Sequence, residues 1–516
     1  MKKIFLGLAI FASLSSIQAQ APVAPARPKL LLMIAVDQLR YDYLVKYRKD
    51  YNAGLAQLLT QGAVFTNAHY EHAPTITAVG HATMLTGASP VLSGIVANEW
   101  FEKESGTVTS SVNDVESRLL GGEGNGATPK RLLVSTVADE IKMAGRGESR
   151  SVGISLKDRS AILMPGRMAD AAYWFIAENG NWVSSSWYMT QLPPWAAAHN
   201  AKRPADKFLG KPWTPITGGK PLRTMNAKPD TMFYSQVETS PFGNELVEEM
   251  AELAVENEKL GTHAATDVLA VSFSSNDLAG HRYGPDSPEV RDMSITTDRA
   301  LGKLFAYLDK KIGMRNVVVA LTADHGVAPI PEVNIARKMP GGRVKDKEIV
   351  AAVETALTAK FGPGKWYVGK SPEQFYLDPA LVEQYGGPQV RAVAADVLRN
   401  FPHVYRVYTR EQLLNGQTGQ DKVGRRVANG YNAARGADLV LILEPYYLFG
   451  ATGTSHSTPF NYDTHVPIIF MGAGIKPGRY HQAAAVNDIA PTLATILEVE
   501  VPAGSMGRVL AEALIR

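Results

Sequence analysis

The sequence contains no cysteine among its 516 residues, and this absence limits both its covalent chemistry and its metal chemistry. Without thiols the chain cannot build a disulfide framework, and no cysteine is available for lipidation behind an export signal. Thiolate zinc sites are excluded for the same reason, so a transition metal would have to bind to nitrogen and oxygen ligands. Histidine, aspartate and glutamate are therefore the candidate metal ligands.

Excess charge and long hydrophobic runs are also lacking. The formal net charge is +3, and it falls to about +1 if Lys2 and Lys3 are removed with an N-terminal segment. A chain so close to neutral gives no electrostatic reason to expect binding to nucleic acid or to an anionic membrane, so an anionic substrate would depend on local charges. After the N-terminus no apolar run approaches the roughly 18 residues of a membrane span, which predicts no stable membrane insertion.

The first residues have the order of an export signal. The basic Met1-Lys2-Lys3 is followed by an apolar stretch from Ile4 to Leu14 and then by small residues in Ala19-Gln20-Ala21. This order is typical of a cleavable signal peptide, and the apolar stretch is too short to cross a bilayer. We predict a signal peptide over residues 1–21 and a periplasmic or secreted mature protein over residues 22–516. A buried N-terminal helix is the alternative.

Short apolar runs recur along the chain, and the first three lead into an acidic residue. Leu30–Val36 precedes Asp37, Val268–Phe273 precedes Asp277, Val317–Leu321 precedes Asp324, and Leu439–Leu443 and Val466–Phe470 are further runs. Such runs suit strands that are buried on both faces, and stretches with helical apolar spacing lie between them. We therefore predict an α/β fold with an open, mostly parallel sheet and helices on both faces. Ligands of such folds gather at the carboxyl ends of the strands.

Two stretches interrupt this pattern and are predicted as insertions into one domain. Residues 172–215 hold five of the seven tryptophans, and aromatic side chains can pack a loop-rich lobe, so we expect an inserted cap rather than sheet there. The first insertion is placed over residues of about 165–235. A more charged and mixed stretch over residues of about 338–435 is predicted as the second.

Histidines and carboxylates that could bind metal are numerous near the predicted strand ends. The candidates are Asp37, Asp277, His281, Asp324, His325, His456 and His465. Asp277 and His281 are four residues apart, so one helical turn brings both side chains to the same face. None of these pairs is decisive alone. Together they form a ligand set of nitrogen and oxygen atoms that suits two zinc ions.

A hydroxyl nucleophile is available in the segment HAPTITAVGHATMLTG, where a loop leads into a helix. Thr75, Thr77 and Thr83 all compete for this role, and a hydroxyl at a helix start usually serves as a cap. A threonine hydroxyl is a poor nucleophile at neutral pH unless a metal or a base activates it. The local pattern alone therefore does not select one threonine.

The order of these motifs resembles the alkaline phosphatases of the phosphate-irrepressible type. Asp37 comes first, followed by Thr77 with a Thr-Gly after it, by an asparagine about twenty residues on, and by the segments DLAGH, TADHG and GTSH. These phosphatases share one superfamily branch with nucleotide pyrophosphatases/phosphodiesterases. The resemblance extends from about Leu30 to the C-terminus, and its motifs are specific jointly because they occur in the required order.

The resemblance implies a site with two zinc ions and a phosphothreonine intermediate on Thr77. One zinc would be bound by Asp37, Thr77, Asp324 and His325, and the other by Asp277, His281 and His456. One zinc would activate the nucleophile while the other holds the leaving oxygen. Asn98 matches a position whose amide donates to a phosphoryl oxygen. His456 is preferred to His465 because GTSH matches the G-x-x-H of these enzymes better.

Lys157 and Arg159 distinguish the possible substrates. In the phosphomonoesterases that the sequence resembles, a Lys-x-Arg at this place contacts the non-bridging oxygens of a dianionic phosphate, which fits the charge of both side chains. We therefore predict an enzyme that hydrolyses small-molecule phosphate monoesters. A phosphodiesterase or nucleotide pyrophosphatase is the alternative. A non-catalytic exported zinc- or phosphate-binding protein is the second, although it would not need Thr77 together with this pair. The sequence indicates neither the natural substrate nor the oligomeric state.

Overall fold

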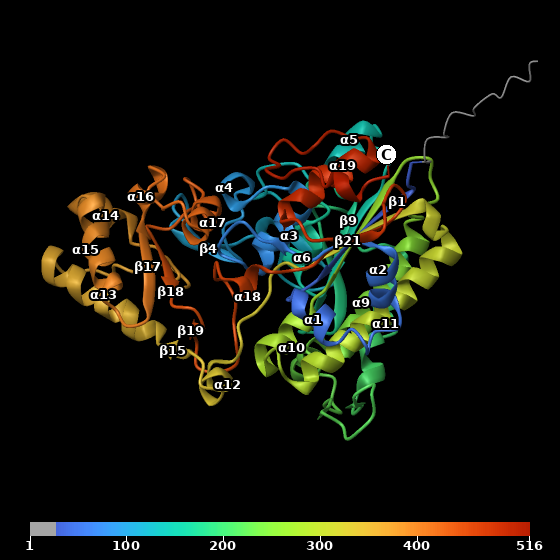
Figure 1. The fold of residues 1–516 in the computed structure, drawn as a ribbon, viewed down its shortest axis with the longest axis horizontal. Coiled ribbons are helices and arrows are strands. Elements are labelled where there is room, and N and C mark those ends of the chain that lie inside the picture. Colours follow the sequence, from blue (N-terminus) through green and yellow to red (C-terminus); the bar gives the residue numbers. More distant parts are fainter. Residues whose placement is uncertain (1–26, 516) are drawn as a thin grey trace, which may run out of the picture.

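The computed structural model describes residues 27–515. Figure 1 shows a larger body built around a central sheet and a smaller lobe that projects from one side of it. The predicted signal peptide over residues 1–21 lies outside the described residues. Within residues 27–515, no helix is both long enough and apolar enough to span a membrane.

The larger body is organised by an eleven-stranded sheet whose centre is parallel. In spatial order its strands are β21 (Gly478–Tyr480), β2 (Ala63–Phe65), β20 (Ile468–Gly472), β14 (Val317–Thr322), β1 (Leu30–Val36), β13 (Asp267–Phe273), β8 (Ser151–Ser155), β9 (Ala171–Ile176), β10 (Asn181–Ser185), β6 (Asn113–Leu120) and β7 (Asn125–Ala127). The five strands from β14 to β9 are parallel, whereas β20 and β10 pair antiparallel with their inner neighbours. The predicted α/β class is confirmed.

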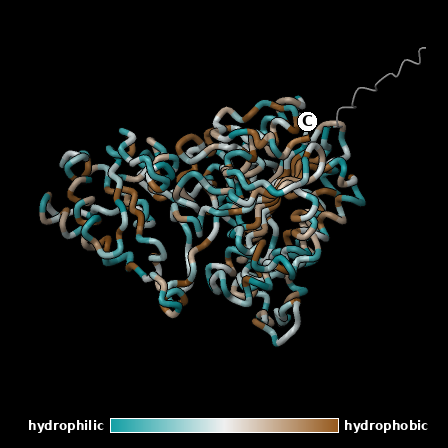
Figure 2. Tube along the Cα trace, viewed as in Figure 1, coloured by the Kyte–Doolittle hydropathy of each residue, from teal (hydrophilic) through white to brown (hydrophobic). Residues whose placement is uncertain are grey.

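The parallel strands are covered on both faces, which explains their composition. Every residue of β1, β13 and β14 is buried, as expected where helices exclude water from both sides of a sheet. The helices α2 (Gly54–Gln61), α9 (Pro241–Asn257) and α11 (Pro288–Lys311) form one layer, and α3 (Thr77–Thr86), α5 (Val137–Ala144), α6 (Asp158–Leu163) and α19 (Ile489–Leu497) form the other (Figure 1). The most hydrophobic segments gather between these layers (Figure 2).

The tryptophan-rich stretch differs from its prediction. Its first part forms β9 and β10, which belong to the central sheet, so the expectation of a cap without sheet is wrong there. Trp174 and Trp182 are 5% and 0% exposed, because their rings cover the sheet toward its edge. Only the later part, from α7 (Pro194–Ala201) to β12 (Arg223–Thr224), runs outside the central sheet.

The smaller lobe contains most of the second predicted insertion and has a hydrophobic core of its own. Its main elements are β15 (Gly342–Val344), α13 (Asp346–Phe361), β16 (Gln374–Phe375), α14 (Pro379–Tyr385), α15 (Gly387–Arg399), β17 (Val404–Thr409), α16 (Arg410–Leu414), β18 (Leu439–Leu443) and β19 (Tyr447–Phe449). Trp366 and Phe375 are fully buried in its core. We expected β18 to be a strand of the parallel sheet, and this is wrong: it is the middle strand of a separate three-stranded sheet.

Candidate active site

Three aspartates meet at one edge of the central sheet. β1 lies between β13 and β14 and runs parallel to both, so the carboxyl ends of the three strands are side by side. Asp37 directly follows β1, Asp324 follows β14, and Asp277 lies in α10 (Ser275–Tyr283), which begins soon after β13. These side chains are at most 2% exposed. Buried carboxylates are costly unless hydrogen bonds, opposite charges or metal ions compensate them.

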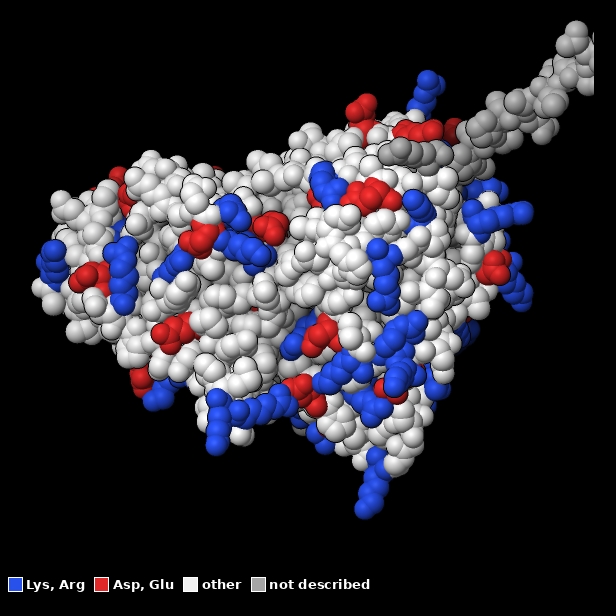
Figure 3. Space-filling view, viewed as in Figure 1, with Lys and Arg blue, Asp and Glu red and all other residues white. Residues whose placement is uncertain are grey.

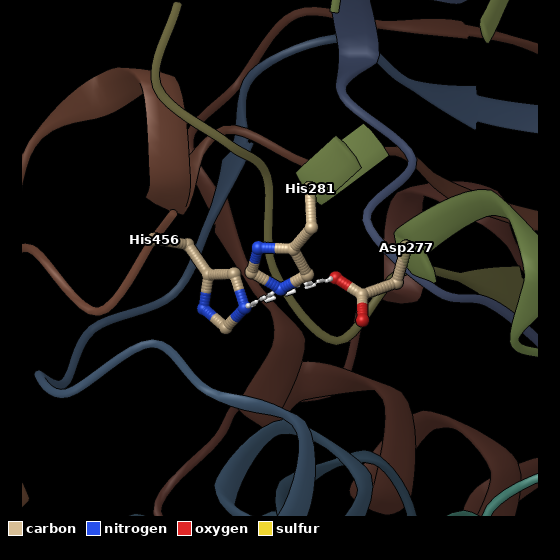
Figure 4. Close-up of side chains that lie close together, drawn as sticks. All are labelled: Asp277, His281 and His456. Carbon is tan, nitrogen blue, oxygen red and sulfur yellow. Dashed lines mark hydrogen bonds and ion pairs between the residues drawn. The ribbon is translucent and has the colours of Figure 1, made fainter. Parts of the chain in front are cut away.

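One of these aspartates forms a three-cornered group with two histidines (Figure 4). Asp277 Oδ1 lies 3.1 Å from His281 Nε2 and 3.7 Å from His456 Nε2, and the two histidine nitrogens are 3.2 Å apart. Ligand atoms about 2.0–2.2 Å from a zinc ion at tetrahedral angles lie roughly 3.3–3.6 Å from one another. The three distances lie within about 0.2 Å of this range, so the side chains are close to the spacing of ligands around a single tetrahedral ion.

A second group of ligand atoms lies beside the first. His325 Nε2 is 3.3 Å from Asp324 Oδ2 and 3.6 Å from Asp37 Oδ1. All three atoms are buried, and none has a hydrogen-bond partner among residues 27–515. Asp277 also has an oxygen within 4.8 Å of ligand atoms from Asp37 and His325, so it lies between the two groups. Buried polar atoms without hydrogen-bond partners require an explanation. Two neighbouring cation sites would explain them, because each cation would bind these atoms.

Burial and the neighbouring carboxylates shift the pKa values of these residues. Burial, followed by the charges of Asp277 and Asp324, raises the pKa of Asp37 to about 8. Burial likewise raises the pKa of Asp324 to about 6. Burial opposes protonation of His281, but the neighbouring Asp277 outweighs it and raises the histidine pKa to about 9. Divalent cations bound there would supply positive charge.

Lys157 supplies positive charge to the site. Its Nζ donates to Asp37 Oδ2 and to Asp277 Oδ2 at 2.6 Å each, and its side chain is only 9% exposed. Burial opposes the charged form, but the attraction of Asp277 and Asp37 outweighs it and raises the pKa of Lys157. The sequence led us to expect this ammonium group to face a substrate, whereas here it contacts two candidate metal ligands. It lies in the site in either case.

Thr77 begins helix α3, next to the second ligand group. Gly80 allows this approach, because a Cβ atom at its position would lie 2.3 Å from the backbone oxygen of Asp324. His81 Nδ1 lies 2.8 Å from the carbonyl oxygen of Thr77 and 3.4 Å from Asp324 Oδ2. These contacts hold the first turn of α3 against Asp324. Thr77 is 2% exposed at the end of the helix where the positive pole of the dipole lies.

The competing threonines are engaged elsewhere. The hydroxyl of Thr75 donates to the carbonyl oxygen of Thr458 at 2.9 Å. The hydroxyl of Thr83 donates to the carbonyl oxygens of Val79 and Ala88 at 2.9 and 3.0 Å. Both hydroxyl protons are therefore engaged by main-chain oxygens.

The two remaining residues with a predicted role lie near the start of α3 and at the start of α6. Asn98 Oδ1 accepts a hydrogen bond from the Ala78 N–H at 2.9 Å, which leaves its NH2 group as the available donor. Arg159 lies in the first turn of α6, and its NH1 is 3.6 Å from Asp158 Oδ1. No hydrogen bond links either side chain to the ligand groups among the described residues.

His465, the alternative ligand, lies apart from both groups. Its Nε2 is 3.0 Å from the carbonyl oxygen of Thr66. Its ring stacks on Tyr41 at 4.8 Å and on His69 at 4.7 Å between ring centroids. The structure therefore brings His456, but not His465, to the side chains of α10.

The family model described as type I phosphodiesterase / nucleotide pyrophosphatase matches residues 31–465. The chain belongs to this family. The family resemblance predicted from the motifs is thereby confirmed, and the matched residues include every predicted site residue from Asp37 to His456.

Relatives that match over nearly their whole length place the chain among the alkaline phosphatases of this family. The alkaline phosphatase PhoV of Synechococcus elongatus is 33% identical over 550 residues, which cover 100% of both proteins. The alkaline phosphatase PafA of Elizabethkingia meningoseptica is 32% identical, over 100% of this chain and 99% of PafA. The crystal structure of PafA matches with a TM-score of 0.89 over 95% of this chain and 99% of that one. A protein of Myroides odoratus named calcium-transporting ATPase is 33% identical over 95% of both.

Two residues of the site, Gln38 and Glu373, were not predicted from the sequence. Gln38 donates from Nε2 to Asp277 Oδ1 at 2.5 Å and from its backbone N–H to Asp324 Oδ1 at 3.0 Å. Its φ of +64° turns the chain so that both contacts are possible. The only available signal was its position directly after Asp37. Glu373 reaches the site from the smaller lobe, and no local pattern marks it.

Proposed function

We propose that this protein is an exported alkaline phosphatase that hydrolyses small-molecule phosphate monoesters through a phosphothreonine intermediate on Thr77. The observation that carries the proposal is the position of a buried hydroxyl at a helix start next to a group of candidate metal-ligand atoms without hydrogen-bond partners, with a second group of candidate ligands beside it. A site that only stored zinc or phosphate would need the ligands but not this hydroxyl. The names of the full-length relatives support the same activity.

Two zinc ions fit the donor set. Asp277, His281 and His456 would hold one ion, and Asp37, Asp324 and His325 would hold the other together with the Thr77 oxygen. Bound there, the metals would lower the pKa of the hydroxyl and stabilise negative charge on the leaving oxygen. The spacing of the first group and the unpartnered atoms of the second support this assignment.

The chain's own groups would carry the transfer in two steps. Thr77 Oγ1 attacks phosphorus and loses its proton to solvent, while the ester P–O bond breaks and the alcohol leaves with a proton taken up from solvent. Water then attacks phosphorus and the Oγ1–P bond breaks, which releases inorganic phosphate and restores the hydroxyl. The NH2 group of Asn98 and the cations of Lys157 and Arg159 would bind the non-bridging oxygens. Such cations form charge-assisted hydrogen bonds to the anionic oxygens of a phosphate.

Two positive side chains favour a monoester over a diester. A terminal phosphate has one more charged oxygen than a diester. Lys157 Nζ lies 2.6 Å from the carboxylates of Asp37 and Asp277. Bound metal ions would neutralise these carboxylates, and the ammonium group would then be available to a phosphate oxygen. A phosphodiesterase would replace the additional charged oxygen with an organic group and gain little from the pair. The formal net charge of +3 gives little long-range attraction for a dianion. Both signs of charge are present on the face drawn in Figure 3, with lysines and arginines more frequent in its lower right part.

The test compares 4-nitrophenyl phosphate with bis(4-nitrophenyl) phosphate on the zinc-loaded enzyme. We expect a kcat/KM for the monoester that is larger by orders of magnitude. Replacing Lys157 and Arg159 together should narrow that ratio. A preference for the diester in the wild-type enzyme would instead assign the protein to the phosphodiesterases of the family, and no turnover of either ester would favour a binding protein.

A further inference from the structure

A pocket of about 310 Å³ opens beside the first ligand group, on the side of the site that faces the smaller lobe. His281 and His456 form one part of its wall, and Asn98 lies next to them. These are the histidines assigned above to the ion at the leaving oxygen. The alcohol part of a phosphate ester bound at Thr77 would therefore extend into this pocket. Its volume lies at the lower end of those that hold small ligands.

Glu373 is the carboxylate in the pocket wall. The hydroxyl of Ser457 donates to its Oε1 at 3.2 Å, and the hydroxyl of Ser371 donates to its Oε2. A carboxylate has about four acceptor positions, so each oxygen can accept a further bond from a ligand. Ser457 follows His456 directly, which puts the carboxylate on the same stretch of wall as that histidine.

The backbone and its neighbours fix the carboxylate in place. Ser457 has a φ of +104°, a conformation that is strained for a residue other than glycine and that often marks a functional site. The carbonyl oxygen of Glu373 accepts a bond from the Leu441 N–H at 2.9 Å, which ties it to β18. The neighbouring Gln374 donates from Nε2 to the Val96 carbonyl oxygen at 3.0 Å, across the boundary between lobe and body. Glu373 is thus held rigidly at the pocket.

The rest of the lining suits a polyhydroxylated group. Ile76, Pro74 and Tyr376 provide an apolar surface for a ring face, while serine and amide side chains surround Glu373. Lys370 and Glu99 lie 3.5 Å apart and balance each other's charge. In dinucleotide-binding folds, an acidic residue recognises ribose by accepting hydrogen bonds from its hydroxyl groups. The same chemistry is available here in the pocket that His281 and His456 also line.

We propose that Glu373 accepts hydrogen bonds from the vicinal hydroxyls of the leaving group, so that monophosphates of ribonucleosides and sugars are preferred substrates. This inference rests on the proposed phosphatase function and adds the class of alcohol that the site selects. Glu373 acts here as a specificity residue that touches the substrate without taking part in phosphoryl transfer. Its loss should leave esters without hydroxyl groups unaffected.

The test uses adenosine 5′-monophosphate and its 2′,3′-dideoxy analogue, which differ only in the two hydroxyls. For the zinc-loaded wild-type enzyme we expect kcat/KM to be about tenfold to a hundredfold higher for the ribonucleotide, the range of hydrogen bonds to a charged group. Glu373→Ala should abolish this preference, and Glu373→Gln, which keeps the shape and a neutral acceptor, should retain part of it. Glu383→Ala is the matched control, because this glutamate lies exposed in α14, away from the pocket.

Hydrolysis of 4-nitrophenyl phosphate separates the possible failures. All variants should keep this rate within about threefold of the wild-type value, which also shows that they are folded and metal-loaded. If the wild-type enzyme does not hydrolyse this ester, the proposed function fails. If it does, but the ribose preference is missing or survives in Glu373→Ala, only the role of Glu373 is overturned. A larger effect of Glu373→Ala on aminoethyl phosphate than on the ribonucleotide would also overturn it, in favour of a cationic leaving group.

Discussion

Replacing Lys157 with methionine should produce two separable losses, because methionine keeps most of the length but removes the charge. In the structure the ammonium group is 2.6 Å from two carboxylate oxygens and its side chain is 9% exposed, so solvent screens it little. Removing one partner of a buried ion pair typically costs about 3–5 kcal/mol. We expect a destabilisation of about this size in metal-free protein. Bound metals would compensate the same carboxylates, so the difference should shrink in zinc-loaded protein.

The loss of catalytic rate in the Lys157 variant should be seen in the zinc-loaded enzyme, whereas its loss of stability should be largest in metal-free protein. In the zinc-loaded enzyme, losing one charge-assisted contact of about 1.5–3 kcal/mol corresponds to a monoester rate about tenfold to a hundredfold lower. Diester hydrolysis should fall much less. Thermal or denaturant unfolding with and without a chelator, combined with kcat/KM for both esters, measures the two effects on one set of samples.

A matched control is available in the same protein. Lys142 Nζ lies 2.6 Å from Asp170 Oδ2, and the lysine side chain is also 9% exposed, but the pair is not part of the site. Lys142→Met should lower stability equally with and without metal and leave both activities unchanged. The reasoning about Lys157 is refuted if its replacement costs the same stability in both metal states, or if the two esters lose rate equally.

Other predictions concern the nucleophile, the metal ligands and a buried carboxyl group. Thr77→Ala should lower the rate by on the order of 10³-fold or more, Thr77→Ser should retain part of it, and mass spectrometry should locate trapped phosphate on residue 77. A chelator should abolish activity and zinc should restore it; in calorimetric titrations His456→Ala should lose far more zinc affinity than His465→Ala. Burial raises the pKa of Glu248 from 4.5 to about 8, so its contribution to stability is lost progressively as pH rises from about 4.5 to about 8. Urea midpoints of Glu248→Gln should therefore fall less between pH 5 and 9 than those of wild type.

The central part of the fold was predictable because burial on both faces leaves a simple signal in the sequence. Continuous apolar runs such as Leu30–Val36 favour strands that are covered on both faces, and Asp37 and Asp324, which follow two of these runs, lie at the carboxyl edge of the central sheet. Amino-acid composition did not predict the structure correctly where the same composition suits two different structures. The rings of Trp174 and Trp182 suit a loop-rich lobe as well as the sheet they actually cover. Leu439–Leu443 is apolar enough for either sheet, and only tertiary contacts decide between them.

Within the site, the sequence indicated which residues are candidate ligands, but it did not indicate all of their contacts. The spacing of Asp277 and His281 predicts a shared helix face, and the structure has both on one side of α10. The contact of Lys157 with two carboxylates depends on how α6 meets the strand ends, which no motif states. Glu373 approaches from a lobe whose position depends on packing between segments far apart in the chain. The roles of all these residues stay predictions until the variants are measured.

The residues proposed to act on the phosphate and the residue proposed to select the alcohol belong to different parts of the fold. Most groups proposed to act on the phosphate come from the strand ends and helix starts of the larger body, where the central sheet fixes the geometry, whereas His281 lies in the last turn of α10 and Asn98 and His456 lie in loops. Glu373, which lines the pocket for the alcohol, comes from a lobe with a separate hydrophobic core, whereas the nearby Tyr376 packs in the hydrophobic cluster that contains Ala78 and Val79 of α3. Substitutions in that lobe can therefore alter which alcohol is accepted without moving the ligand groups. Selectivity between alcohols and the rate for a plain aryl ester should accordingly vary independently.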